Sequence, residues 1–263
     1  MMKVNGIDNK VAIITGAGCG IGLSITELLL SNGCNVVLND IDNQIVAENT
    51  RGLLESYPEN LKIYSGNASD VDVINAIIDF TVLHFGTIDF VLANAGITQF
   101  KQFHEVEPKD FDGIVDVNLK GTFFLVQKAT KIMMKQDKGG RVLLMSSNIG
   151  HIPYPKTTVY SMTKAALNML CKSLVVDLMA FDITVNSISP GATITERTLK
   201  ESSDYESVWK RIIPNKSVAS TRDIANTCIF LLSQQGKHIN GQNMVIDGGW
   251  SVLGKYPEFQ LEN

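Results

Sequence analysis

The stretch Thr15-Gly16-Ala17-Gly18-Cys19-Gly20-Ile21-Gly22 lies between an apolar run, Val11–Ile14, and a helical pattern over residues 22–32. Glycines let a backbone turn tightly and approach a phosphate, and a helix N-terminus offers unpaired N–H groups to an anion. The glycines are spaced G-x-x-x-G-x-G rather than G-x-G-x-x-G, through Gly16, Gly20 and Gly22. Because the stretch joins a strand to a helix, it predicts a loop that binds a pyrophosphate.

Short apolar runs alternate with amphipathic stretches along the rest of the chain. Near-continuous apolar runs rich in β-branched residues are typical of strands buried on both faces of a parallel sheet. The runs are Val11–Ile14, Val36–Leu38, Ile63–Tyr64, Ile88–Leu92, Val142–Met145, Ile183–Ile188 and Met244–Ile246. The helical patterns cover about 22–32, 43–56, 70–85, 109–135, 158–180 and 222–233. This alternation predicts an α/β fold, a doubly wound parallel sheet with helices on both faces.

The clearest helical pattern runs from Asp70 to Phe85, where apolar residues recur at spacings of three and four. Ser69 or Asp70 can cap its start, because their side-chain oxygens accept from free backbone N–H groups. Gly86 can end it by taking the left-handed conformation.

Length and charge narrow the class of protein. The 263 residues contain no Pro- or Ser-rich linker and no fixed repeat, so we expect one domain spanning 1–263. The net charge of −4 and the absence of a basic block argue against nucleic acid or an anionic membrane surface as a partner. No apolar run approaches the roughly 20 residues of a membrane span, and residues 1–10 contain no apolar export signal.

Four cysteines, none in a Cys-x-x-Cys pair, indicate a reducing compartment, and we expect a cytoplasmic protein. Small buried hydrophobes are the expected role of these residues, which are Cys19, Cys34, Cys171 and Cys228. The histidines show no metal-ligand spacing, so no metal is expected.

Asp40 ends the second apolar run, near the ~20-residue offset at which an acid binds the ribose hydroxyls of a dinucleotide. Its carboxylate would repel the extra phosphate of NADP, Asp42 adds negative charge, and no Arg or Lys stands nearby. NAD is therefore the expected cofactor, with NADP disfavoured and Ile41 beside the same site. The alternative is that Asp40 only caps the following helix.

Tyr160 and Lys164 stand four residues apart at the start of a predicted helix, and so share one face. A free tyrosine has a pKa of ~10, and a nearby ammonium lowers it toward the range of a useful base. Ser146-Ser147 ends the fifth predicted strand and projects hydroxyls toward the ligand edge of the sheet. Taken alone, the Tyr–Lys pair could equally be solvated surface.

These motifs together resemble the short-chain dehydrogenase/reductase family. The resemblance covers about residues 8–249 and rests on Thr15–Gly22, Asn94-Ala95-Gly96, Asn118, Ser147, Tyr160, Lys164 and Pro190-Gly191, in family order. It implies a single Rossmann-type domain built on a seven-stranded parallel sheet. It also implies hydride transfer between a nicotinamide ring and a carbon that carries a hydroxyl or carbonyl group.

The resemblance assigns catalytic roles to four of these residues. Tyr160 is the general acid/base at the substrate oxygen, and Lys164 lowers its pKa and binds the nicotinamide ribose. Ser147 hydrogen-bonds the substrate oxygen. Asn118 positions a water that relays protons through Lys164.

The resemblance also assigns residues to the cofactor. Asn94 and Gly96 form a turn against the adenosine, although Ala93 stands where the family often has another asparagine. Asn67 replaces the usual aspartate at the adenine amino group. The segment Pro190–Thr195 is expected to bind the carboxamide through Ile194 and the Thr195 hydroxyl. The complete cofactor set is Gly16, Cys19, Gly20, Ile21, Gly22, Asp40, Ile41, Asn67, Ala68, Asn94, Gly96, Tyr160, Lys164, Pro190, Gly191, Ile194 and Thr195.

The substrate is expected beneath a lid over about 193–214, whose many charges suit a small hydroxylated substrate or simply form a solvated helix face. His151 follows the Ser147 strand and is a candidate substrate contact, with a structural role as the alternative. The tail Lys255–Gln260 resembles that of bacterial glucose 1-dehydrogenases, which favours an aldose or polyol.

Two other functions stay open at this point. The first is 3-oxoacyl-[acyl-carrier-protein] reductase, which would use NADPH and present a basic patch to the acidic carrier. The second is a catalytically silent nucleotide-sensing protein. The family resemblance further implies a homotetramer paired through the helices at 109–135 and 158–180 and through the C-terminal strand.

Overall fold

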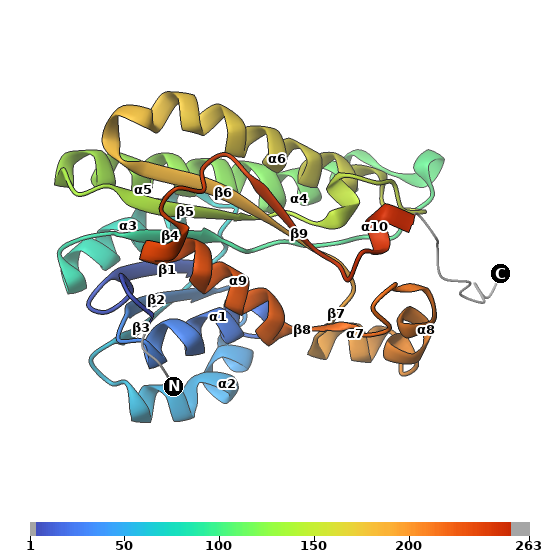
Figure 1. Ribbon diagram of the computed structural model, residues 1–263, viewed down its shortest axis with the longest axis horizontal. Helices are drawn as coiled ribbons and strands as arrows, with labels where there is room; N and C mark the ends of the chain where they lie inside the picture. Colours follow the sequence, from blue (N-terminus) through green and yellow to red (C-terminus); the bar gives the residue numbers. More distant parts are fainter. Residues whose placement is uncertain (1–3, 254–263) are drawn as a thin grey trace.

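Seven parallel strands form the central sheet of the computed structural model, which describes residues 4–253 (Figure 1). Their order is β3-β2-β1-β4-β5-β6-β9. The strands are β1 Val11–Thr15, β2 Asn35–Asp40, β3 Leu61–Ser65, β4 Phe90–Ala93, β5 Gly140–Met145, β6 Ile183–Pro190 and β9 Asn243–Ile246. Each overlaps one of the predicted apolar runs, and β1, β4 and β6 are buried along their whole length. The predicted doubly wound fold is confirmed.

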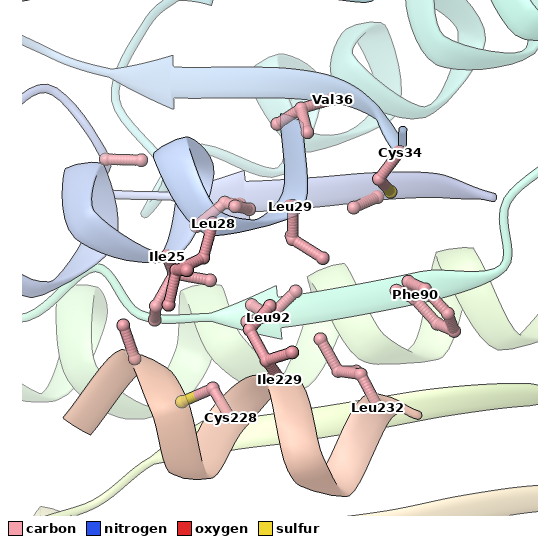
Figure 2. Close-up of a cluster of buried hydrophobic side chains, with 14 of the residues drawn as sticks. Ile25, Leu28, Leu29, Cys34, Val36, Phe90, Leu92, Cys228, Ile229 and Leu232 are labelled. Carbon is pink, nitrogen blue, oxygen red and sulfur yellow. The ribbon is translucent and has the colours of Figure 1, made fainter. Parts of the chain in front are cut away.

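Helices cover both faces of this sheet (Figure 1). One face is covered by α1 Gly20–Ser31, α2 Asn43–Ser56 and α9 Thr221–Leu232. The other is covered by α3 Val71–Phe85, α5 Thr122–Gln136 and α6 Thr158–Leu178. Figure 2 shows the first core, where Ile25 and Leu29 of α1 and Ile229 of α9 meet Leu92 of β4. Such burial supplies most of the stabilisation of a fold of this size.

The helix α3 begins and ends with the caps that its sequence predicts. The Asp70 carboxylate accepts from the Asp72 N–H at 2.8 Å, and Gly86 takes the left-handed conformation with φ +73°. Ile74, Ile77 and other apolar residues of one face are buried against the sheet.

The predicted helix over 109–135 is wrong in one respect, because it is interrupted. It consists of α4 Pro108–Val115, a π-helical turn Asp116–Gly121 and α5. At the end of the turn Gly121 packs so closely on Ala68 that a Cβ there would lie 2.2 Å from the Ala68 carbonyl oxygen. The extra residue in the π turn breaks the 3.6-residue periodicity that the sequence prediction assumed.

The segment after β6 forms a small substructure of its own. The strand β7 Thr193–Ile194 pairs with β8 Ala219–Ser220, and between them lie α7 Glu196–Glu201 and α8 Tyr205–Ile212. Figure 1 shows α7 and α8 at the same end of the molecule as α10, Trp250–Leu253. Within residues 4–253, no helix is long and apolar enough to cross a membrane.

Candidate active site

One large cleft, of about 1340 Å³, holds most of the residues that the sequence singles out. It follows the carboxyl ends of β1, β2, β4, β5 and β6, where ligands bind in open α/β sheets. The predicted site residues that line it are Gly16, Cys19, Gly20, Ile21, Gly22, Asp40, Ile41, Asn67, Ala68, Asn94, Gly96, Ser147, Tyr160, Lys164, Pro190, Gly191 and Thr195.

The glycine loop leaves space that a side chain would fill. Gly16 has φ +62°, and a Cβ there would lie 2.7 Å from the Ala95 Cα. A Cβ on Gly22 would lie 2.5 Å from the Gly16 carbonyl oxygen. Cys19 is the N-cap of α1 and is only partly buried, which corrects the expectation that all four cysteines are buried. No side chain caps the start of α1, so its first backbone N–H groups can bind a ligand in the cleft.

Asn94 fastens this loop to the sheet. Its side-chain nitrogen donates to the carbonyl oxygens of Thr15 at 3.0 Å and Gly16 at 2.7 Å. The hydroxyl of Thr15 accepts in return from the Asn94 backbone N–H at 3.2 Å. The side chain predicted to lie against the adenosine thus also holds the phosphate loop in place.

Asp40 is tied to the glycine loop rather than to the helix that follows it. One carboxylate oxygen accepts from the Gly18 N–H at 2.8 Å and the other from the Ile41 N–H at 2.7 Å. The cap of α2 is Asp42, which accepts from the N–H groups of Gln44 and Ile45. The alternative role of Asp40 as a helix cap is therefore wrong.

Asn67 has its side-chain oxygen engaged within its own turn. That oxygen accepts from the Ser69 N–H at 3.0 Å and from the Ser69 hydroxyl at 2.9 Å. A carbonyl oxygen has two lone pairs, so both are used here. Asn67 lines the cleft, and its contact with an adenine amino group stays a prediction.

Tyr160, Lys164 and Ser147 come together at the far side of the cleft. Tyr160 and Lys164 lie on α6, and the Lys164 Nζ is 5.5 Å from the centroid of the Tyr160 ring. Lys164 is buried and donates to the Met145 carbonyl oxygen at 2.7 Å. Ser147 follows β5, and its Oγ accepts from the Ile149 N–H at 3.2 Å. The possibility that the Tyr–Lys pair is solvated surface is excluded by this burial.

The electrostatics of the pair differ from the sequence-based expectation. Burial raises the pKa of Tyr160, whereas hydrogen bonding to Ser147 and Thr98 and the charge of Arg197 lower it. Burial also lowers the pKa of Lys164 to about 8, and Arg197 adds to this shift. Arg197, a residue of the lid that no motif identified, thus contributes to lowering the pKa of Tyr160.

Asn118 lies beneath the cleft rather than in its wall. Its side chain pairs with the backbone of Ile97, accepting from the N–H at 2.8 Å and donating to the carbonyl oxygen at 3.0 Å. It also donates to the Thr163 hydroxyl at 3.2 Å. A Cβ on Gly96 would lie 3.3 Å from both the Asn118 Oδ1 and the Lys164 Nζ. The π turn thus brings Asn118 close to Lys164.

Two of the expected contacts lie elsewhere. The His151 ring is 2.6 Å from the Asn243 Oδ1 of β9, and His151 is not among the residues that line the cleft, so its substrate contact stays a prediction. Ile194 lies in β7 and packs against a buried cluster formed by Trp209, Ile213, Val218 and Trp250. The Thr195 hydroxyl lines the cleft but caps α7, accepting from the Thr198 N–H at 3.2 Å.

Sequence reasoning missed the character of the cleft wall beyond Tyr160. The lid residues form the ion pairs Arg197–Glu201 and Lys210–Glu206. Arg197 and Glu201 line the cleft, so the solvated-helix alternative holds only for Lys210 and Glu206. Aromatic rings line the cleft beside these charged residues. The aromatic residues that line the cleft are Phe100, Tyr154, Tyr205, Trp209 and Trp250. The sequence signal that could have identified Trp209 is its position on α8, four residues after Tyr205, which places both rings on one face of that helix.

Comparisons with known proteins agree with this geometry. The profile of the family described as "Enoyl-(Acyl carrier protein) reductase" matches residues 16–251. A 3-oxoacyl-[acyl-carrier-protein] reductase of Staphylococcus aureus is 34% identical over 240 residues, covering 91% of this chain and 97% of the relative.

Two solved structures from Brucella melitensis are similar along their whole length. A short-chain glucose/ribitol dehydrogenase has a TM-score of 0.88 at 28% identity, covering 95% of this chain and 99% of the other. A 3-ketoacyl-(acyl-carrier-protein) reductase complexed with NADH has a TM-score of 0.85 at 27% identity, covering 94% and 100%.

The fold and the site together define an oxidoreductase that acts on CH–OH or carbonyl groups. The chain belongs to the short-chain dehydrogenase/reductase family.

Proposed function

We propose that this chain reduces a ketone to a secondary alcohol with a nicotinamide dinucleotide, and that it prefers NAD(H) to NADP(H). One arrangement carries the proposal. The glycine loop, Asp40 and the Ser147–Tyr160–Lys164 group line a single continuous cleft. The NADH complex of the similar ketoacyl reductase supports the choice of cofactor.

The residues present fit a dinucleotide. The backbone packs so closely at Gly16 and Gly22 that a Cβ at either position would clash. The first N–H groups of α1, which no side chain caps, lie at this loop and can bind a phosphate. Asp40 stands at the end of β2, where its carboxylate suits ribose hydroxyls and opposes a phosphate. The cleft volume also exceeds the roughly 300–1,000 Å³ of a typical single-ligand pocket. When bound, a reduced nicotinamide would supply the hydride that the carbonyl carbon receives.

The chain's own residues would handle the proton and the substrate oxygen. Tyr160 would donate its phenolic proton to that oxygen in reduction and accept it back in alcohol oxidation. Ser147 would donate a hydrogen bond to the same oxygen and hold it at Tyr160. Lys164 would bind the ribose, and Asn118 would hold the turn at Ile97 and Gly96 beside Lys164.

The substrate class expected first from the sequence is less well supported than its alternative. The family description and the Staphylococcus aureus relative both name acyl-carrier-protein reductases. The aldose or polyol expectation has support from the glucose/ribitol dehydrogenase structure. The tail Lys255–Gln260 that favoured it lies outside the described residues. We therefore place ketone reduction, with 3-oxoacyl thioesters as one class to test, ahead of sugar oxidation.

The test is oxidation of NADH or NADPH by the purified protein with acetoacetyl-CoA and simple ketones, and reduction of NAD with aldoses and polyols. We expect ketone-dependent oxidation of NADH, slower with NADPH. Turnover confined to sugars would restore the first expectation. Tight NADH binding without any turnover would support the silent nucleotide sensor.

The variant Tyr160→Phe isolates the proposed acid/base. Turnover should fall at least about 100-fold, because general acid–base catalysis contributes that much or more. NADH binding, followed by nicotinamide fluorescence, should be nearly unchanged. Full activity in this variant would contradict the mechanism.

We also propose a homotetramer, with residues 193–214 as a substrate lid and a cytoplasmic location. An apolar stripe on α6 supports the assembly, because its exposed residues Met162, Met169 and Val176 lie on one face of the helix. Light scattering at micromolar concentration should give the mass of four chains, and a monomer would contradict this proposal.

A further inference from the structure

A wall of aromatic side chains forms the part of the cleft beyond the catalytic group. We call Phe100, Tyr154, Tyr205, Trp209 and Trp250 the aromatic wall, and all five line the cleft. They come from separate segments: the loop after β4, the loop after β5, the helix α8 and the start of α10. Figure 1 shows α8 and α10 at one end of the molecule.

The rings of this wall contact one another in a chain. The Tyr154 and Trp209 centroids are 6.4 Å apart with planes at 27°, and Trp209 and Trp250 lie 5.3 Å apart, edge to face. Phe100 extends the chain, with its ring centroid 6.4 Å from that of Tyr154. These separations are the ones that aromatic pairs favour. Trp209 and Trp250 are buried, so the back of the wall is rigid, whereas Phe100 is 54% exposed.

Two members of the wall, Tyr154 and Trp250, belong to segments that hydrogen-bond to those carrying the catalytic group. The Tyr154 carbonyl oxygen accepts from the Thr157 hydroxyl at 2.8 Å, and Thr157 is the N-cap of α6, which carries Tyr160. Asp247, three residues before Trp250, accepts from the Asn148 side chain at 3.4 Å, next to Ser147. The wall and the catalytic group thus belong to connected segments and line one cleft.

Building on the proposed function, we propose that the substrate is a ketone fused to a planar aromatic ring, which lies along the aromatic wall with its carbonyl oxygen at Tyr160 and Ser147. A rigid ring stacks on other rings while losing little conformational entropy. A flexible acyl chain would lose rotamer freedom against this wall.

The reaction balances as an ordinary carbonyl reduction. The carbonyl carbon gains a hydride from NADH, forming a C–H bond, and the carbonyl oxygen gains the proton of Tyr160. The C=O π bond becomes a C–O single bond, so the ketone is reduced to a secondary alcohol and NADH is oxidised to NAD.

The test compares β-tetralone, a bicyclic ketone with a fused aromatic ring, with β-decalone, its saturated counterpart of similar size. Acetoacetyl-CoA serves as the acyclic ketone. With NADH, we expect kcat/KM for β-tetralone to exceed that for β-decalone by about tenfold, because one stacking contact contributes about that factor. Equal values for the two bicyclic ketones, or reduction of acetoacetyl-CoA alone, would overturn the ring proposal and leave the proposed function standing.

Two exposed phenylalanines provide a matched pair of variants. Phe100 lines the cleft, whereas Phe103, three residues on and 76% exposed, does not. Neither is buried, so both substitutions should leave the fold intact. Phe100→Leu should raise KM for β-tetralone severalfold more than KM for acetoacetyl-CoA, whereas Phe103→Leu should change neither. An unchanged β-tetralone KM in Phe100→Leu would contradict the proposed stacking.

Tryptophan fluorescence tests binding without turnover. The chain has two tryptophans, Trp209 and Trp250, and both belong to the aromatic wall. With NAD bound, β-tetralone should quench this fluorescence at lower concentration than β-decalone. If no ketone is reduced but this difference is seen, the proposed function fails and the aromatic site stands. If β-tetralone leaves the fluorescence unchanged, the ring proposal fails.

Discussion

The ammonium of Lys164 lies against the ring of Tyr160, with its Nζ 5.5 Å from the ring centroid. It is buried there and donates to the Met145 carbonyl oxygen at 2.7 Å. Burial lowers the pKa of Lys164 to about 8 from an ordinary value of 10.5. The residue that was expected to shift the pKa of its neighbour is thus itself strongly shifted, and it releases its proton near physiological pH.

This shift makes the stability of the fold depend on pH in a defined window. Below pH 8, Lys164 is protonated in the folded and unfolded chains, so the penalty for burying its charge is fully present. Between about pH 8 and 10.5 the folded chain releases the proton first. The free energy of unfolding of the wild type should therefore rise across this window, by at most about 3 kcal/mol, relative to Lys164→Met. Denaturant titrations of both proteins check this, and parallel pH curves would contradict it.

Asp40 should determine the choice between NAD and NADP. Asp40→Asn removes the negative charge that opposes the extra phosphate, so it should lower the preference for NADH by about tenfold, which corresponds to ~1.4 kcal/mol. Asp42→Asn is the matched control, because asparagine caps a helix as well as aspartate does and Asp42 does not line the cleft. Fluorescence titrations with NADH and NADPH measure both. Equal loss of preference in the two variants would mean that net charge alone decides.

Most of the fold could be predicted from the sequence, because buried parallel strands leave a continuous apolar signal. The two ends of α3 could be predicted equally well, because Asp70 and Gly86 end the helix through local backbone geometry. The break at Asp116–Gly121 could not be read, because it depends on the packing of Gly121 against Ala68, far away in the chain. Caps and turns depend on a few neighbouring residues and can be predicted from a short stretch of sequence. Contacts between residues far apart in the chain cannot.

The same division holds within the candidate site. The glycine loop and the pair on α6 are local motifs and could be placed directly. The partners of His151 lie on α6, β6 and β9, and the aromatic wall gathers residues from four segments. No single spacing pattern in the sequence joins the members of either group.

Replacing glycine with alanine should have opposite effects on stability in the glycine loop and in α2. Gly16→Ala places a Cβ 2.7 Å from the Ala95 Cα at a positive φ, so it should destabilise the fold by about 1–3 kcal/mol and weaken NADH binding. Gly52→Ala, in α2, meets nothing within 4 Å and should stabilise the fold by up to about 1 kcal/mol. Thermal unfolding with and without NADH compares the two. Unaltered NADH affinity in Gly16→Ala would argue against this loop as the phosphate site.

Arg197 should set the pH dependence of catalysis from the lid. Its charge lowers the pKa of Tyr160, and its guanidinium donates to the Thr98 hydroxyl at 3.5 Å. In alcohol oxidation Tyr160 must accept a proton, so activity rises with pH through its pKa. Arg197→Gln should move this rise to higher pH, whereas Arg211→Gln, which also removes a cation from the cleft, should not. Profiles of kcat/KM against pH measure the shift. If both variants move the profile equally, the effect comes from the general charge of the cleft, and if neither does, Arg197 does not act on the phenol.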